Sequence, residues 1–247
     1  MNLSEFFAKH TKVALAFSGG VDSAYLLYAT TLHKVDVVAY YIRSQFQPEF
    51  EYNDAIRLAK ELNARIKVID VDVLQNDKVA KNPSNRCYIC KNMIFQTIIN
   101  AAKEDGYTTI IDGTNASDLE DDRPGMKALK ELSVLSPLRL CGITKDEVRK
   151  LSKEAGLFTW DKPAYACLAT RVKTDEIITA DALRRIEIAE DYLHELGLLN
   201  VRVRYSQNKV RLEIDKKKID LFEQYKTEIF EKLSNMFEDI ESDITYR

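Results

Sequence analysis

The residues most able to do chemistry form a short run of glycines and hydroxyl side chains at positions 18–23, with the sequence SGGVDS. The run directly follows the apolar stretch 13–17 and directly precedes a helical pattern. Two adjacent glycines allow a sharp turn and a close approach to a ligand. A helix that begins here points its N–H groups and the positive end of its dipole at the same place. We therefore expect an anion-binding loop.

This loop differs from two common nucleotide motifs. It lacks the lysine of G-x-x-x-x-G-K-[ST] and the spacing of G-x-G-x-x-G. An ordinary strand–turn–helix with a glycine bend is the alternative interpretation, and the six matching residues in this context favour the anion site over it.

Four cysteines make up the second group of chemically active residues, and two of them form the C-x-x-C pair Cys87 and Cys90. That spacing indicates a metal or a redox pair. A zinc site would need a fourth ligand, and none of the three histidines lies near Cys90 or Cys167 in the sequence. A redox pair normally lies at a helix N-terminus in a thioredoxin-like setting, which we do not expect here. Buried cysteines that act as small apolar residues are the remaining interpretation, and we expect this for Cys141.

A basic hairpin is the third feature. Arg202 and Arg204 are two residues apart in a predicted strand, so their side chains lie on one face, and Lys209 and Arg211 of the next strand could join them. Paired arginines suit a phosphate because the guanidinium binds it in a bidentate manner. A solvated charged face is the alternative.

These residues must be positioned by an alternation of strands and helices. Apolar runs at 13–17, 35–41, 66–71 and 109–112 predict buried strands, and helical patterns occupy 24–32, 49–62 and 91–103. A capping box at 144–147 opens a further helix that ends near Gly156. This order predicts an α/β fold with a doubly wound parallel sheet.

The pattern of predicted elements changes after Pro163. A charged helix is expected over 179–196, followed by strands at 201–205 and 209–214 and by helix to the end of the chain. We therefore expect two domains, residues 1–168 and a small α+β domain at 169–247.

Composition narrows the class of protein. The 247 residues include 36 Lys and Arg and 39 Asp and Glu, a net charge of -3. The chain therefore has no overall positive charge that would attract nucleic acid. No apolar run reaches the roughly 18 residues of a membrane-spanning helix, and the first five residues do not resemble a signal peptide. We expect a cytoplasmic protein with no nucleic-acid and no membrane partner.

Several motifs together resemble one family. SGGVDS resembles the pyrophosphate loop of the PP-loop ATPases, which have the adenine nucleotide alpha hydrolase-like fold. The segment 111–118 followed by DDRPG at 121–125, the segment 162–171 around Cys167, the hairpin at 201–204 and the C-x-x-C-K of 87–91 resemble the LarE family. Members of that family make pyridinium-3,5-bisthiocarboxylic acid mononucleotide for a nickel-pincer cofactor.

The resemblance implies an ATP-dependent sulfur transferase that uses ATP and Mg²⁺, which Asp22 would help to organise. It implies ATP contacts from the loop and from the end of a neighbouring strand: Ala16, Ser18, Gly19, Gly20, Val21, Asp22, Ser23, Asp112, Gly113 and Thr114. Arg123 could meet a phosphate of the nucleotide. Arg202 and Arg204 would bind the phosphate of the mononucleotide substrate.

The family also implies roles for metals and for sulfur. Cys87, Cys90 and Cys167 match the members in which three cysteines hold a [4Fe-4S] cluster, while a single sacrificed cysteine, here Cys167, is the other route. A weaker match implies a divalent cation held by Glu190, Glu213 and Asp220. A sulfide donor and a homo-oligomer are further implied partners. The alternatives are a tRNA-thiolating PP-loop enzyme, and a nucleotide or iron–sulfur binding module without catalysis.

Overall fold

The computed structural model describes residues 1–118, 124–241 and 245–246. Four parallel strands build its first sheet in the order β3-β2-β1-β4, with bounds β1 (Lys12–Ala16), β2 (Asp36–Arg43), β3 (Arg65–Asp70) and β4 (Ile110–Asp112). The chain adds β2 and β3 on one side of β1 and β4 on the other. Open α/β sheets bind ligands where the strand order reverses in this way, at the carboxyl ends of the strands.

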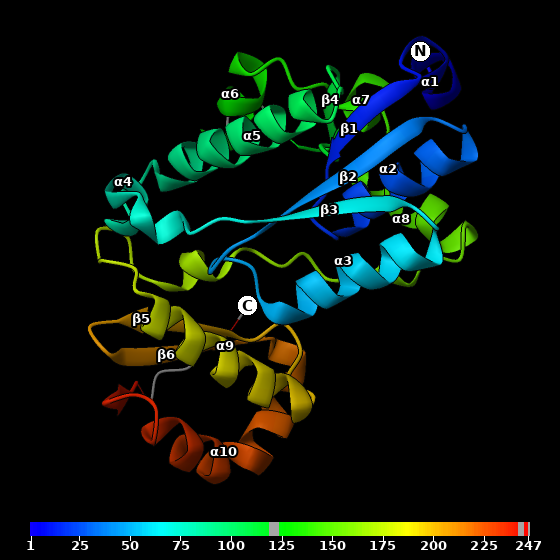
Figure 1. Cartoon of the computed structure of the whole chain (residues 1–247). Coiled ribbons are helices and arrows are strands. Elements are labelled where there is room, and N and C mark those ends of the chain that lie inside the picture. The colour runs from blue at the N-terminus through cyan, green and yellow to red at the C-terminus, as the bar shows by residue number, and fades with distance from the viewer. Residues whose placement is uncertain (119–123, 242–244, 247) are drawn as a thin grey trace. The chain divides into compact units, whose positions relative to one another are not determined.

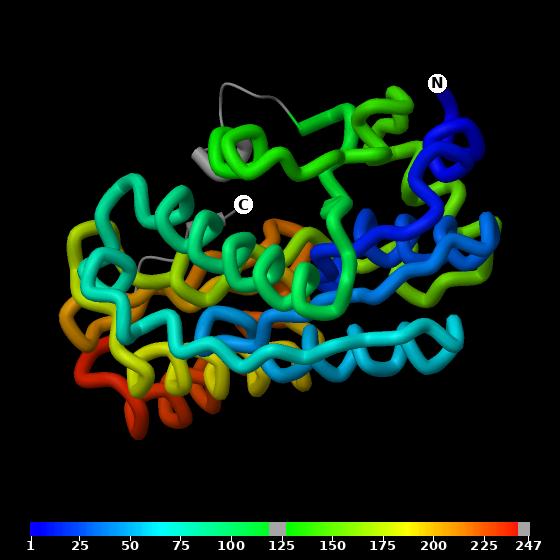
Figure 2. The backbone as a smooth tube through the Cα atoms, turned by 45° about the horizontal axis from the view of Figure 1, so that its top comes forward, coloured from blue at the N-terminus to red at the C-terminus, as the bar shows by residue number. Residues whose placement is uncertain are grey.

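Helices cover both faces of this sheet. On one face, the inward side chains of β1 pack with α2 (Val21–Leu32), α3 (Glu49–Glu61) and α8 (Lys145–Glu154). On the other face, Ala14 and Tyr40 pack with Phe95, Ile98 and Ala102 of α5 (Arg86–Glu104). Figure 1 shows α5 and α3 on opposite sides of the sheet, and the turned view of Figure 2 shows the same separation. The predicted α/β fold with a doubly wound parallel sheet is confirmed.

The helix predicted at 91–103 is longer than expected, because it begins at Arg86. The C-x-x-C pair therefore lies at the N-terminal end of α5. Several short elements have no counterpart in the prediction: α1 (Leu3–Lys9), η1 (Val73–Gln75), α4 (Asp77–Ala80), α6 (Pro124–Glu131), α7 (Pro137–Leu140), η2 (Phe158–Asp161), η3 (Leu168–Arg171) and η4 (Lys216–Lys218). Most of these span one turn, which is too little for a hydrophobic period to show.

A second, mixed sheet follows. Its centre is the predicted hairpin, β5 (Arg202–Ser206) antiparallel to β6 (Lys209–Ile214), with α9 (Ala180–Glu195) before it and α10 (Ile219–Ser234) after it. The expected helix to the end of the chain is wrong. Past α10, β7 (Asp239–Ile240) and β8 (Thr245–Tyr246) pair in parallel with β6. A strand of two residues is too short to show an alternating pattern in the sequence. These two strands form because the edge of β6 is open for pairing.

The chain divides into two compact units, residues 1–71 with 87–164 and residues 72–86 with 165–247. The predicted boundary after residue 168 does not anticipate that 72–86 belong to the second unit. The reason is a set of long-range hydrogen bonds: Asn82 donates from its side-chain amide to the carbonyls of Val172 and Lys173, and Ile178 N donates to Ala80 O. No helix in the described residues combines the length and apolar character needed to cross a membrane.

Candidate active site

The glycine loop leaves β1 and enters α2 through a turn that favours glycine. Gly19 has a φ of 73°, in the left-handed region. A Cβ atom there would lie 3.2 Å from the backbone oxygen of Glu51 and 3.2 Å from Cβ of Ala55. The predicted sharp turn is present, and α3 leaves little space for a side chain at its apex.

Hydroxyl groups close the loop on itself. Ser18 N donates to Ser23 Oγ at 3.3 Å, and Ser23 Oγ donates to Gly20 O at 3.1 Å. The two serine Oγ atoms lie 3.1 Å apart. Within the described residues α2 has no side-chain cap, and the first N–H bonded along the helix is that of Ala24 to Gly20 O. The preceding amides therefore offer their hydrogens to an anion, which fits a phosphate.

The end of β4 lies beside this loop, since Asp112 is in register with Ala16. The Asp112 carboxylate accepts hydrogen bonds from Ser136 Oγ at 2.6 Å and from Thr114 Oγ1. Burial raises the pKa of this carboxyl, and the two hydroxyl donors oppose the shift. Gly113 packs so closely that a Cβ would lie 2.7 Å from Ser23 N. The predicted ATP-contact residues of β1, α2 and β4 thus form one group.

Asp22 has two partners from distant segments. Lys145 Nζ lies 2.5 Å from Asp22 Oδ2, and Asn115 Nδ2 donates to Asp22 Oδ1 at 3.2 Å. Sequence reasoning missed Lys145 as a site residue. The capping box placed it at the start of α8, but only the packing of α8 on α2 brings its ammonium group to the loop. A carboxylate and an ammonium group beside uncapped amides suit a polyphosphate with its Mg²⁺.

The C-x-x-C pair occupies the N-terminal end of α5, where Cys87 is exposed and Cys90 is buried. The expectation that this pair does not lie at a helix N-terminus is therefore wrong. Lys91, which follows Cys90, lies near enough to Asp112 for its charge to offset a small part of the rise that burial causes in the pKa of that carboxyl. The start of α5 thus reaches the same end of the sheet as the loop.

Cys167 belongs to the second unit and directly precedes η3. No three of the described His, Cys, Asp and Glu side chains are grouped to hold one metal ion. The fit of an iron–sulfur cluster to Cys87, Cys90 and Cys167 therefore rests on donor chemistry, since three thiolates can ligate three irons. The cluster stays a prediction.

Two of the three carboxylates expected to bind a divalent cation, Glu190 and Glu213, have other partners. Glu190 is 1% exposed and forms a bidentate ion pair with Arg171. Glu213 accepts from Arg204 Nη2 at 2.9 Å, and Asp220 is exposed in the first turn of α10. In the part of the chain that the structure describes, no metal-binding group includes these three residues. The structure gives the predicted cation site no support.

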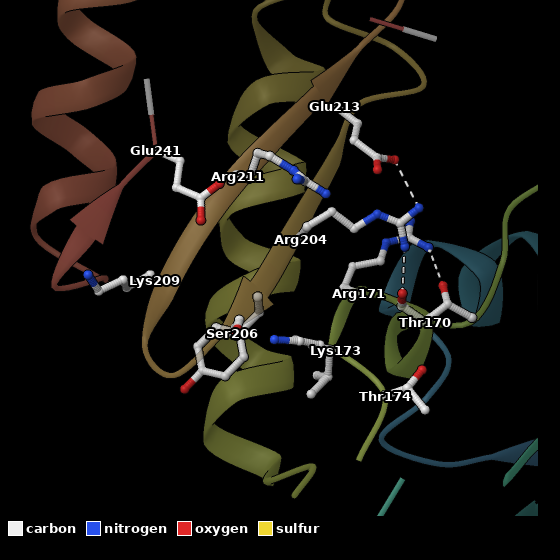
Figure 3. A pocket seen from close by; sticks show the side chains of 12 residues that line it. Thr170, Arg171, Lys173, Thr174, Arg204, Ser206, Lys209, Arg211, Glu213 and Glu241 are labelled. Carbon is white, nitrogen blue, oxygen red and sulfur yellow. Dashed lines mark hydrogen bonds and ion pairs between the residues drawn. The ribbon is translucent and has the colours of Figure 1, made fainter. Parts of the chain in front are cut away.

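A basic pocket of about 480 Å³ opens on the hairpin of the second unit (Figure 3). Four cationic side chains of the described residues line it, from the segment after η3 and from both strands: Lys173, Arg204, Lys209 and Arg211. Arg171 also lines the wall, but its guanidinium is buried against Glu190 and is not available to an anion. Arg204 and Arg211 face each other across β5 and β6. Arg204 is also anchored, because its Nη1 donates to Thr170 O at 2.6 Å. The pocket suits a phosphate or another small anion.

The predicted phosphate pair is only partly present in this pocket. Arg204 lines it, whereas Arg202 is not among its lining residues, and Lys173 was not predicted at all. Lys173 lies between η3 and a turn, in a segment with no periodic pattern, so no local signal identifies it. Arg123, with Asp121 and Asp122, lies outside the described residues.

Comparison with known proteins places this geometry in a family. A family model described as NAD synthase matches residues 4–87, the part with the glycine loop. An uncharacterized protein of Synechocystis sp. is 38% identical over 90% of this chain and 84% of its own. The pyridinium-3,5-bisthiocarboxylic acid mononucleotide synthase of Lactiplantibacillus plantarum is 30% identical over 91% of this chain and 82% of its own.

The chain belongs to the LarE family. A tRNA-specific 2-thiouridylase, MnmA of Pseudothermotoga lettingae, is 28% identical over 61% of this chain and 54% of its own. LarE-family and MnmA proteins are both PP-loop enzymes that transfer sulfur. This LarE-family chain is an ATP-dependent sulfur transferase, and the resemblance to the LarE family is confirmed.

Proposed function

We propose that this LarE-family chain converts the two carboxylates of pyridinium-3,5-biscarboxylic acid mononucleotide into thiocarboxylates, in the synthesis of a nickel-pincer cofactor. The observation that carries the proposal is the uncapped start of α2 with Asp22 and Lys145 beside it. This arrangement suits the polyphosphate of ATP, whose cleavage activates a carboxylate. The name of the Lactiplantibacillus relative supplies the substrate class.

The first step forms an acyl-adenylate. A carboxylate oxygen of the substrate attacks the α-phosphorus of ATP, the bond from that phosphorus to the bridging oxygen breaks, and pyrophosphate leaves with the electron pair. Amides of the α2 N-terminus and Lys145 stabilise the charge that develops on the pyrophosphate. Asp22 would coordinate Mg²⁺, and Lys145 would then face the phosphates.

The second step replaces oxygen by sulfur. Hydrosulfide attacks the acyl carbon, the bond to AMP breaks, AMP leaves with the electron pair and the hydrosulfide proton passes to solvent. Cys87, Cys90 and Cys167 would hold a [4Fe-4S] cluster, which when bound supplies a sulfide at its one iron without a protein ligand. Arg204 of the basic pocket would hold the substrate phosphate, and Arg202, outside the pocket lining, stays a predicted second contact. A sulfide donor would restore the sulfur.

Anaerobic purification followed by iron and sulfide analysis tests this assignment. We expect about four irons per chain in the wild type and in Cys141→Ala, and a loss of iron in Cys167→Ala. ATP and the mononucleotide should then yield pyrophosphate, AMP and thiocarboxylate over several turnovers when sulfide is supplied. Wild-type protein without iron that still turns over would contradict the cluster.

A sacrificial route is the second possibility, and it also uses Cys167. Its Sγ would form a thioester with the activated carboxyl group, and loss of the Cα proton with cleavage of the Cβ–S bond would release thiocarboxylate and leave dehydroalanine. A loss of one H₂S from the protein mass after a single turnover, without iron, would establish it.

A tRNA substrate is favoured by one observation, the match to MnmA over 61% of the chain. Pyrophosphate release separates the two substrates, because only the correct acceptor should stimulate it. We expect stimulation by the mononucleotide and none by tRNA. The expected homo-oligomer is tested by light scattering of the same preparations.

A further inference from the structure

Arg171 and Glu190 form an ion pair that is closed to solvent. Each side chain is 1% exposed. Arg171 donates from Nε to Glu190 Oε1 and from Nη2 to Oε2, both at 2.8 Å. Tyr165 OH donates to Oε2 at 2.6 Å, and Val203 N donates to Oε1 at 2.9 Å. Two donors on each oxygen fill the four lone-pair positions of the carboxylate, so a metal ion would have to displace one of them.

The same guanidinium holds the backbone on both sides of Cys167. Arg171 Nη1 donates to Ala166 O at 2.7 Å and to Thr170 Oγ1 at 3.1 Å. Thr170 in turn donates to Cys167 O, from N at 2.9 Å and from Oγ1 at 2.8 Å. The peptide groups before and after Cys167 are therefore both hydrogen-bonded to this cluster. The position of the cysteine Cα follows from the position of Arg171.

Thr170 also connects this cluster to the basic pocket. Its carbonyl accepts the hydrogen bond from Arg204, and both Thr170 and Arg171 line the pocket wall. Figure 3 shows Arg204 reaching toward Thr170 and Glu213. An anion bound by Arg204 would therefore have a set position relative to the backbone that carries Cys167.

Buried ion pairs are weak contributors to stability, since apolar residues of similar volume often stabilise as much or more. A network that saturates one carboxylate and fixes one loop is better explained by the geometry that it imposes. We infer that Arg171 and Glu190 are positioning residues that hold Cys167 in register with the basic pocket. The inference rests on the proposed function, in which both sulfur routes use Cys167.

The test replaces the pair by apolar residues, Arg171→Met together with Glu190→Leu, which keeps volume and removes the hydrogen bonds. Thiocarboxylate formation should fall about 100-fold in kcat, the size expected of a displacement near 1 Å. The KM for the mononucleotide and the rate of pyrophosphate release should change less than about twofold. The matched control is the exposed pair Lys226 and Glu223, both changed to Ala, which should retain full kcat.

Glu190→Gln is a second variant that keeps the shape of the side chain and serves if the double variant does not fold. Unchanged kcat in a folded variant would overturn the inference, because a merely structural pair affects stability and not the rate. A raised requirement for Mg²⁺ or Mn²⁺ in Glu190→Gln would also overturn it in favour of a metal ligand.

Hydrogen exchange provides a readout that does not depend on the proposed function. The Thr170 amide should exchange at least about tenfold faster in the double variant, since its acceptor is the Cys167 carbonyl. Unchanged exchange would overturn the inference even in an active enzyme. If the wild type transfers no sulfur but the Thr170 amide still exchanges faster in the double variant, the proposed function is refuted. The positioning role of Arg171 and Glu190 then still holds.

Discussion

Glu190 illustrates how partners decide the role of a single residue. A glutamate on a charged helix is equally compatible with a cation ligand or a surface charge, and neighbouring sequence does not distinguish them. The fold places it against Arg171, Tyr165 and Val203 N, which together saturate it. Lys145 gives the converse case, because a residue at a helix start becomes part of the nucleotide loop through Asp22.

Asp112 leads to a pH prediction at the same scale. Its pKa is raised in the folded protein by burial, so the folded state holds its proton to a higher pH than the unfolded state does. Stability contributed by this group is therefore present below the ordinary carboxyl pKa and decreases as the pH rises toward the folded value. Asp112→Asn should flatten this decrease and raise stability at neutral pH.

Urea unfolding of the wild type and of Asp112→Asn between pH 4 and 7 measures the difference. Asp118→Asn is the control, since that side chain is less buried and caps Asn115 N. If the unfolding free energy changes with pH equally in the wild type and in Asp112→Asn, Asp112 is not the source of the pH dependence.

At the scale of elements, the site depends on how closely the turn after β4 approaches the start of α2. Gly113 allows the approach, and the turn is further held because Ala116 N donates to Ile143 O and Lys145 N donates to Ser117 Oγ. The carboxyl ends of β1 and β4 therefore supply one continuous surface, which is where we propose that the nucleotide binds.

Gly113→Ala tests this arrangement. The added Cβ would lie 2.7 Å from Ser23 N, so the turn must move away from α2, and ATP affinity should fall by about tenfold or more. Equilibrium binding of α,β-methylene-ATP measures the effect. Gly156→Ala is the control, because its φ of 70° makes alanine strained while no atom lies within 4 Å. It should lose about 1 kcal/mol of stability and keep its affinity. Normal affinity in Gly113→Ala would contradict the close packing.

The whole molecule consists of two compact units, and the proposed chemistry draws on both. The first unit holds the nucleotide loop and the C-x-x-C pair, and the second holds Cys167 and the basic pocket. The stability of each unit can therefore be measured with the ligand proposed for it, a nucleotide for the first and a small anion for the second.

Because the nucleotide loop belongs to the first unit, a bound nucleotide should stabilise that unit in the whole chain. An ATP analogue at 100 times its Kd should add about 2.7 kcal/mol to the unfolding free energy of the first unit. Ser23→Ala removes the hydroxyl that closes the loop, so the same concentration of the analogue should add much less to the unfolding free energy of this variant. Thermal unfolding with and without Mg²⁺ and α,β-methylene-ATP measures both. An equal shift in the two proteins would mean that the nucleotide binds elsewhere.

The amino-acid sequence by itself determined the local features: the glycine loop, the strands of the parallel sheet, the capping box at Thr144 and the alternating hairpin. Such features depend on periodicity, capping and turn chemistry, which act over a few residues. Only the tertiary structure decided which distant groups meet, such as Lys145 with Asp22 and Arg171 with Glu190. It also joined residues 72–86 to the second unit and added β7 and β8. These pairings depend on packing between elements far apart in the chain, and local sequence carries no record of that packing.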